Sequence, residues 1–273
     1  MKPDQEFLNA VIKYNPIHIL LLFSGGHDSL CSTHYAISLM KNNDITIPFS
    51  VYHGDTGTGI KETQNFVLKV CKSFGWDLII RKPTGKNTYE SFVKKFGFPG
   101  PSMHNVMYRN LKEKPLNKFI THQIKTRPYA RENVLLVTGI RSSESIIRMG
   151  YKDSVKKDNS KIWTSPIMDW SKKDCEGWIK AHNLPRNPVK DKICISGECL
   201  CGCFAKPEEY AEIKASYPDA WEKLEKMKKY SKWGWGKDPN QWRKHNPEGQ
   251  MKIPFMPMCV GCESKEYPPP SSG

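Results

Sequence analysis

The sequence contains no long hydrophobic run. Its longest apolar stretch, residues 17–23, includes His18, whereas a membrane-spanning helix needs roughly 20 consecutive apolar residues. The first residues, MKPDQE, are polar and lack the apolar stretch of a secretory signal. Because both features are missing, we expect a cytoplasmic protein without a membrane partner. The hydrophobic content of 38% is enough for a packed core, which excludes a wholly disordered chain.

Acidic side chains are also scarce. The chain has 28 Asp and Glu against 42 Lys and Arg, which gives a formal net charge of +14. Much of this excess lies in residues 104–131 and 226–245, each with seven basic residues and one acidic residue. Clustered basic residues suit a polyanionic partner such as nucleic acid, although lysines on a solvated face produce the same composition.

Cysteines are unevenly distributed, because six of the nine lie between residues 194 and 262. In a reducing compartment such crowding indicates metal binding or thiol chemistry rather than disulfides. Their CxCxC and CxxC spacings suit a tetrahedral sulfur site for Zn²⁺ or an iron–sulfur cluster, and buried cysteines without a ligand are the alternative. We expect four of these six to bind the metal: Cys194, Cys199, Cys201, Cys203, Cys259 and Cys262.

Strand-like and helix-like segments alternate along the chain. Apolar runs predict strands at residues 17–23, 45–53, 77–81 and 134–138. Helices are predicted at residues 28–41, 62–74, 104–125 and 171–183, the last beginning at a cap formed by Ser171 with Asp174. Strands separated by helices indicate βαβ units. The prediction is an α/β fold with an open, mostly parallel twisted sheet and helices on both faces.

A glycine-rich turn, SGGHDS at residues 24–29, connects the first predicted strand to a helix. Gly25 and Gly26 allow a tight turn whose N–H groups approach an anion, and the helix N-terminus adds oriented dipoles. Open α/β sheets bind ligands at this carboxyl edge. An ordinary βα turn is the alternative. Residues 54–62 do not form a Walker A loop, because Ile60 separates Gly59 from Lys61.

Five further motifs follow in order: HGDTG…ET at residues 53–63, LK…PL at 111–116, TGIR..ES..R at 138–148, PI.DW at 166–170 and LPRNP at 184–188. Together with SGGHDS they resemble the N-type ATP pyrophosphatases, the PP-loop superfamily that includes the sulfonucleotide (PAPS/APS) reductases. The resemblance covers roughly residues 15–190 and implies an adenine nucleotide alpha hydrolase-like fold. We therefore divide the chain into a nucleotide-binding domain (1–190), a Cys-rich metal-binding module (191–263) and a flexible tail (264–273).

The resemblance also implies an ATP site. Its binding residues would be Ser24, Gly25, Gly26, His27, Asp28, Ser29, Gly57, Gly139 and Arg141. We assign catalytic roles to Asp28, Asp55, Arg141 and Arg148. Arginines beside a glycine turn suit bidentate phosphate contacts, although surface arginines are the alternative. Asp55 suits Mg²⁺, a cation that prefers oxygen ligands, or else caps its own turn.

Two departures from the family argue against a reductase. Iron–sulfur APS reductases carry a cysteine pair just before LK…PL, where this chain has Met107 and Tyr108. The reductases also carry a catalytic cysteine in an ECGLH-type segment, which this sequence lacks. The Cys-rich segment after LPRNP instead resembles the ATP pyrophosphatases of DNA phosphorothioation systems, the Dnd and Ssp types.

The predicted function is an ATP pyrophosphatase that adenylates a nucleic-acid phosphate, in particular the DNA backbone, for sulfur transfer. Sulfur would come from a cysteine desulfurase partner, and a [4Fe–4S] cluster is preferred to Zn²⁺ because sulfur-handling relatives use one. The alternatives are a sulfonucleotide reductase and a non-catalytic nucleotide- or nucleic-acid-binding subunit with a structural metal. Near residues 230–245, tryptophans either stack on bases or pack over the metal site.

Overall fold

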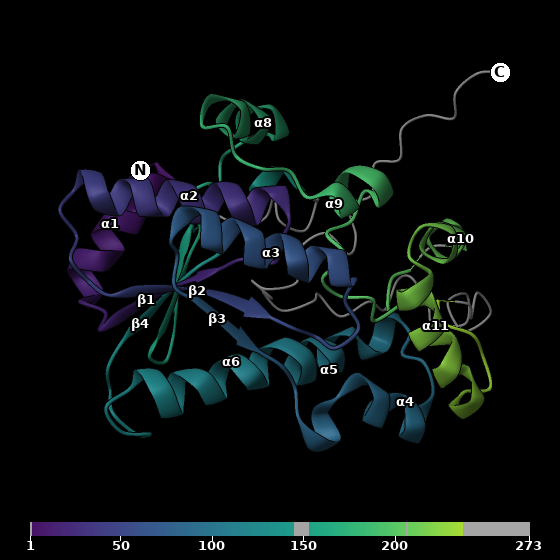
Figure 1. The fold of residues 1–273 in the computed structure, drawn as a ribbon. Coiled ribbons are helices and arrows are strands. Elements are labelled where there is room, and N and C mark those ends of the chain that lie inside the picture. Colours follow the sequence, from purple (N-terminus) through teal and green to yellow (C-terminus); the bar gives the residue numbers. More distant parts are fainter. Residues whose placement is uncertain (1, 145–152, 206, 237–273) are drawn as a thin grey trace.

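A computed structural model describes residues 2–144, 153–205 and 207–236 of the chain. Its centre is a six-stranded sheet in the order β3-β2-β1-β4-β6-β5 (Figure 1). All neighbouring strands are parallel except β5, which is antiparallel to β6. The predicted open, mostly parallel sheet is confirmed. The strands are β1 (His18–Leu22), β2 (Phe49–Gly54), β3 (Leu78–Arg81), β4 (Val134–Val137), β5 (Val155–Asp158) and β6 (Lys161–Thr164).

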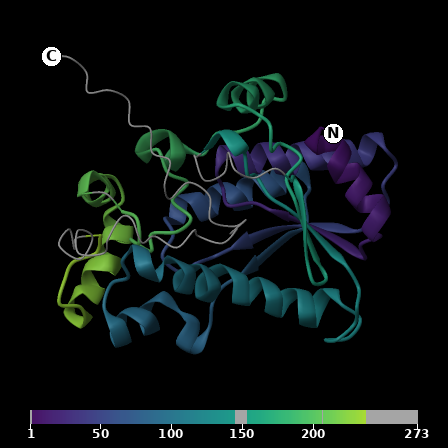
Figure 2. The same ribbon diagram turned by 180° about the vertical axis from the view of Figure 1, so that it is seen from behind.

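Helices cover both faces of the sheet, as Figure 1 and the reverse view in Figure 2 show. Ile19 and Leu21 point to one face and pack in a cluster with residues of four helices. Leu20 points to the other face and packs against Leu116 and Phe119. This alternation makes the strands apolar on both sides, as a buried parallel sheet requires. The four helices are α1 (Pro3–Tyr14), α2 (His27–Asn42), α3 (Lys61–Phe74) and α8 (Lys172–Ala181).

The opposite face is covered by a helical segment that runs through residues 104–124. It consists of α5 (His104–Tyr108), the π-helical turn η3 (Arg109–Glu113), α6 (Lys114–Phe119) and a second π-helical turn, η4 (Ile120–Ile124). The sequence prediction of a helix at 104–125 is confirmed. Ser171 caps α8 as predicted: its Oγ accepts from Asp174 N at 3.2 Å, and the Asp174 carboxylate accepts from Ser171 N at 2.7 Å.

Other segments differ from the sequence prediction. The strand predicted from residue 45 begins only at Phe49, after Pro48, which has no N–H for the sheet ladder. The sequence pattern does not predict the β5–β6 hairpin or helices α1, α4 and α9. The remaining helices are α4 (Tyr89–Phe96), α9 (Pro188–Ile193), α10 (Pro207–Ser216), α11 (Pro218–Met227) and the short turns η1 (Gly85–Asn87), η2 (Pro101–Met103), η5 (Ser142–Glu144) and η6 (Lys228–Tyr230).

A second hydrophobic cluster lies beyond the carboxyl edge of the sheet. It joins α4, α5 and α11 to residues 200–203 of the Cys-rich segment. Residues from both sides of position 190 therefore share this cluster, and the division of the chain at that position stays a prediction. Within the described ranges, no helix has the length and apolar character needed to cross a bilayer.

Candidate functional site

The SGGHDS turn at residues 24–29 forms a compact loop between β1 and α2. Gly25 has φ +85°, a conformation that favours glycine. Ser29 Oγ donates to Gly26 O at 2.9 Å and lies 3.0 Å from Ser24 Oγ. Gly26 is the N-cap of α2, a helix of 16 residues. The loop therefore places backbone N–H groups at a helix N-terminus, an arrangement that binds phosphate.

Arg141 connects this loop to the turn that follows β4. Its Nε lies 3.1 Å from Asp28 Oδ1, and its Nη2 donates to Asp28 Oδ2 at 3.2 Å. Arg141 is only 7% exposed, and Nη1 also donates to Ser143 Oγ at 2.9 Å. The two residues form a bidentate pair at the point where the strand order reverses between β1 and β4. This position is where open α/β sheets bind nucleotides.

Gly139 packs against the same loop. A Cβ at Gly139 would lie 2.6 Å from Ser29 N and 2.7 Å from Asp28 C. Only a glycine fits so close to another backbone. The predicted site residues of the β1 and β4 turns are thus brought together, whereas Arg148 lies outside the described residues.

His27 faces away from this joint, toward α8 and α9. Nδ1 lies 3.9 Å from Glu176 Oε1, and Nε2 lies 3.7 Å from Asp191 Oδ1. Burial, followed by the nearby charge of Arg186, lowers the pKa of His27. Arg186 also bonds both carboxylates, and its hydrogen bond lowers the pKa of Asp191. His27 therefore lies beside Glu176 of α8 and Asp191 of α9.

Asp55 caps its own turn after β2. Its Oδ1 accepts a hydrogen bond from Gly57 N at 2.8 Å. Asp55 therefore has the turn-capping role that was the alternative to binding Mg²⁺. None of the described residues bonds Oδ2. One carboxylate oxygen therefore remains for a cation such as Mg²⁺, which is bound largely by substrate phosphates. The magnesium role of Asp55 stays a prediction.

Residues 194–205, here termed the Cys loop, lie along the same edge of the sheet. Ile60 N donates to Gly197 O at 2.7 Å, and Leu200 N donates to Thr58 Oγ1 at 3.1 Å. A Cβ at Gly59 would lie 2.6 Å from Glu198 O. The first half of the Cys loop is therefore held against the turn that follows β2.

Asn187 joins the Cys loop to the phosphate loop. Its side chain is fully buried, and Nδ2 donates to Gly25 O at 2.8 Å and to Ser196 O at 3.3 Å. Its Oδ1 accepts from Val189 N at 3.0 Å and caps α9. The sequence places Asn187 in the LPRNP motif but gives it no role, because its partner Gly25 is 162 residues away.

We expect Asn187→Ala to lower the free energy of unfolding by about 2 kcal/mol, because the buried Gly25 carbonyl and the buried Val189 N–H lose their bonds to Asn187. ATP affinity should fall as well, since the Gly25 carbonyl is no longer fixed. Urea denaturation and calorimetric titration with ATP measure the two effects. Asn9→Ala on α1 is the control. A variant that is less stable but binds ATP as tightly as the original chain would contradict a role at the phosphate loop.

The second half of the Cys loop lies beneath aromatic side chains. Tyr89 Oη donates to Cys201 O at 2.9 Å, and Trp235 Nε1 donates to Leu200 O at 2.9 Å. Trp233 Nε1 donates to Phe98 O at 2.9 Å. Of the two predicted roles for the tryptophans, the structure shows packing for Trp233 and Trp235. Trp242 lies outside the described residues.

The predicted metal ligands are only partly described. Cys201 and Cys203 lie in the second hydrophobic cluster and Cys199 packs against it, whereas Cys194 is exposed with φ +59°. Among residues 2–144, 153–205 and 207–236, no three Cys, His, Asp or Glu side chains could hold a metal ion together. Cys259 and Cys262 lie outside these ranges. The described donors therefore do not form a metal site by themselves, and the cluster stays a prediction.

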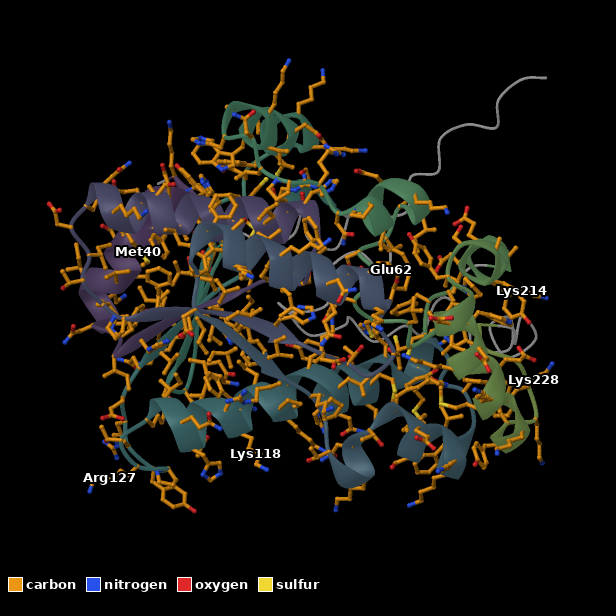
Figure 3. The ribbon with its side chains drawn as sticks, viewed as in Figure 1. Met40, Glu62, Lys118, Arg127, Lys214 and Lys228 are labelled. Atoms are coloured by element: carbon orange, nitrogen blue, oxygen red, sulfur yellow. The ribbon has the colours of Figure 1, made fainter. Side chains whose placement is uncertain are left out.

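Lys112 of the LK…PL motif forms a buried ion pair with the Cys loop. Its Nζ lies 2.7 Å from Glu198 Oε2, and the two side chains are 7% and 8% exposed. The predicted basic segment at 104–131 thus begins at the site. The segment ends far from the site. Arg127 lies at the other end of the molecule from Glu62, which is in the first turn of α3 after the turn that contacts the Cys loop (Figure 3).

Comparison with known proteins places these features in a family. Two uncharacterized proteins of Methanocaldococcus jannaschii are each 30% identical to the chain, over 207 and 215 residues. The matches cover 74% and 77% of this chain but 45% and 41% of the relatives. An uncharacterized protein of Escherichia phage 186 is 25% identical over 157 residues, and the match covers 54% of this chain and 46% of the phage protein. The chain therefore spans less than half the length of these curated relatives.

Several solved structures resemble the chain at low identity. A phosphoadenylyl-sulfate (PAPS) reductase from Candida auris is 20% identical with a TM-score of 0.48, covering 70% of this chain and 84% of the reductase. An NH3-dependent NAD synthetase from Campylobacter jejuni is 16% identical with a TM-score of 0.46, and the match covers 83% of this chain and 90% of the synthetase. Residues 18–209 match the phosphoadenosine phosphosulfate reductase domain. Because this match covers most of the chain, the chain belongs to the phosphoadenosine phosphosulfate reductase domain family.

Proposed function

We propose that the protein is an ATP pyrophosphatase that adenylates an acceptor phosphate for sulfur transfer. The observation that carries this proposal is the joint between the phosphate loop and the β4 turn, made by Asp28, Arg141 and Gly139. It combines a helix N-terminus with a fixed guanidinium beside it. Both are suited to the triphosphate of ATP and to the pyrophosphate that leaves.

The proposed reaction has two displacements. In the first, an acceptor phosphate oxygen attacks the α-phosphorus of ATP, the bond from that phosphorus to the bridging oxygen breaks, and pyrophosphate leaves. In the second, the terminal sulfur of a persulfide attacks the acceptor phosphorus and AMP leaves with the bridging oxygen; a free thiol then cleaves the S–S bond, which leaves the sulfur on the acceptor and forms a disulfide. Adenylation is needed because an unactivated phosphate oxygen is a poor leaving group. The net charge of +14 favours a nucleic-acid backbone as the acceptor. We propose DNA in particular because the Cys-rich segment resembles that of the DNA phosphorothioation enzymes.

The residues of the chain bind and orient the reactants in this scheme. The N–H groups at the start of α2 hold phosphate oxygens, and Asp28 keeps the Arg141 guanidinium in place beside them. Mg²⁺ bound to the ATP phosphates would neutralise part of their charge, and Asp55 Oδ2 is its proposed protein ligand. Since the Cys loop borders the phosphate loop through Asn187, we propose that it faces the sulfur donor, a cysteine desulfurase.

ATP turnover tests the proposal. Purified protein with Mg²⁺, ATP and DNA should release pyrophosphate, and AMP should be released as well once a sulfur donor such as hydrosulfide is added. Arg141→Lys keeps the charge but cannot form the bidentate pair, so we expect about 100-fold slower release. Arg127→Lys, at the opposite end of the molecule, is the matched control and should leave the rate unchanged. Release of ADP and phosphate would overturn the proposal, and ATP binding without turnover would support a non-catalytic nucleotide-binding subunit.

A sulfonucleotide reductase is the second candidate, because the matched family is named after this activity. The thiols of the Cys loop would then supply the electrons. Met107 and Tyr108 occupy the place of the cysteine pair of iron–sulfur APS reductases; both are buried, and Met107 belongs to the second hydrophobic cluster. Thioredoxin-dependent formation of sulfite from PAPS or APS would establish this activity instead.

A further inference from the structure

Helix α4 and the turn η6 present neighbouring lysines to solvent. Lys94 and Lys95 are exposed near the end of α4, and Lys228, Lys229 and Lys232 are exposed on and after η6. The two elements pack against each other, and Phe98 N donates to Ser231 Oγ at 3.2 Å. The exposed lysines of these two adjacent elements, whose segments are more than 130 residues apart, are here together termed the basic face.

Only part of this positive charge is neutralised within the protein. Lys94 pairs with Glu90 at 2.7 Å, and Lys228 pairs with Glu225 at 3.1 Å. Lys95, Lys229 and Lys232 have no acidic partner among the described residues. A surface with three such lysines is suited to the phosphates of a polyanion.

Two aromatic rings lie among these lysines and are open to solvent. Tyr230 is 38% exposed and Phe96 is 52% exposed. Lys94 Nζ and Lys229 Nζ lie 5.5 and 5.0 Å from the centre of the Tyr230 ring. Lys95 Nζ lies 5.0 Å from the centre of the Phe96 ring. Phosphate-binding lysines beside exposed rings are the combination that binds single-stranded nucleic acid, because each unpaired base can stack on a ring.

The basic face is connected to the candidate active site through the Cys loop. Helix α4 begins at Tyr89, which bonds the Cys loop at Cys201 O, and the segment after η6 bonds it through Trp235. The other side of the Cys loop is joined to the phosphate loop through Asn187. In Figure 3, Lys228 lies at the same end of the molecule as Glu62 and opposite Arg127.

We infer that the basic face binds single-stranded nucleic acid and so directs the acceptor toward the nucleotide site. This inference rests on the proposed function only for the fate of the bound strand. An oligonucleotide binds the lysines through its phosphates and stacks bases on Tyr230 and Phe96. Bases within duplex DNA do not stack on these rings, because their faces are already covered by the neighbouring base pairs.

Fluorescence anisotropy with a labelled dT20 strand and a 20-base-pair duplex tests this without ATP, so its result is independent of pyrophosphate release. The variant Lys95→Glu/Lys229→Glu/Lys232→Glu should bind dT20 at least 10-fold more weakly at 100 mM salt. The slope of log affinity against log salt should fall by about 2, since each phosphate that is no longer neutralised lowers it by roughly 0.7. Tyr230→Ala should weaken binding by roughly 5- to 100-fold.

The matched control is Lys118→Glu/Arg127→Glu/Arg131→Glu, which changes the charge equally on exposed residues. Lys118 and Arg127 lie away from Lys228 in Figure 3, and Arg131 directly follows the turn that begins at Arg127. The affinity of this control variant for dT20 should stay within threefold of that of the original chain. An equal weakening in both triple variants would overturn the inference, since net charge alone would then explain the binding. Tighter binding of the duplex, or no binding of dT20 by the original chain, would also overturn it. Thermal melting confirms that each variant is folded.

Discussion

Gly139→Ala is expected to reduce the binding and turnover of ATP strongly. The new Cβ would lie 2.6 Å from Ser29 N and 2.7 Å from Ser29 Cα. Both atoms belong to the backbone of the phosphate loop, so no side-chain rotation can relieve the overlap. The β4 turn and the phosphate loop must therefore separate.

This separation acts on the Asp28–Arg141 pair, which joins the same two turns. A displacement of about 1 Å at a reacting group can cost about 100-fold in rate. We expect ATP-dependent pyrophosphate release to fall by about that factor, and the free energy of unfolding to fall by about 1–3 kcal/mol. Calorimetric ATP titration, the pyrophosphate assay and urea denaturation measure the three effects.

Gly177→Ala is the matched control. Gly177 lies within α8, and a Cβ there meets no atom within 4 Å. Alanine is more favourable than glycine inside a helix by roughly 0.5–1 kcal/mol, so this variant should be slightly more stable and fully active. If Gly139→Ala bound ATP and turned it over like Gly177→Ala, the close contact between the β4 turn and the phosphate loop would have no part in nucleotide binding.

The parts of the fold that depend on local patterns are predictable from the sequence. Apolar runs locate β1, β3 and β4, and periodicity locates α2 and α3, because each pattern reflects which side of one element is buried. The cap at Ser171 is predictable for the same reason, since both partners lie within four residues. The β5–β6 hairpin is not, because Lys156 and Lys157 make β5 polar, as an edge strand allows.

The candidate site is predictable in composition but not in its connections. The motif order brings Asp28, Gly139 and Arg141 together correctly, yet it does not indicate that Asp28 and Arg141 pair with each other. The roles of Asn187 and Glu198 have no sequence signal, because their partners are distant in the chain and only the folded backbone brings them close. His27 shows the same limit: its place in SGGHDS suggests phosphate, whereas its ring lies against Glu176 and Asp191.

Lys112→Met should destabilise the protein strongly, because it leaves the Glu198 carboxylate buried without its partner. Removing one member of a buried ion pair costs about 3–5 kcal/mol. Both side chains are less than 10% exposed, so solvent cannot take the place of the ammonium group. The Cys loop should then detach from the turn after β2, where Thr56 Oγ1 donates to Glu198 O at 2.8 Å. Urea denaturation measures the destabilisation, and ATP titration shows whether the site is affected.

A double-mutant cycle separates pairing from packing. Lys112→Met/Glu198→Leu removes both charges and keeps similar volumes, so it should recover most of the stability, as apolar replacements of buried ion pairs often do. The exposed pair of Lys94 and Glu90 is the control, and Lys94→Met should have a far smaller effect because water screens that pair. A double variant as unstable as Lys112→Met alone would mean that Lys112 stabilises the Cys loop through groups other than Glu198. If the double variant is stable but binds ATP poorly, the charge pair serves the nucleotide site rather than the stability of the fold.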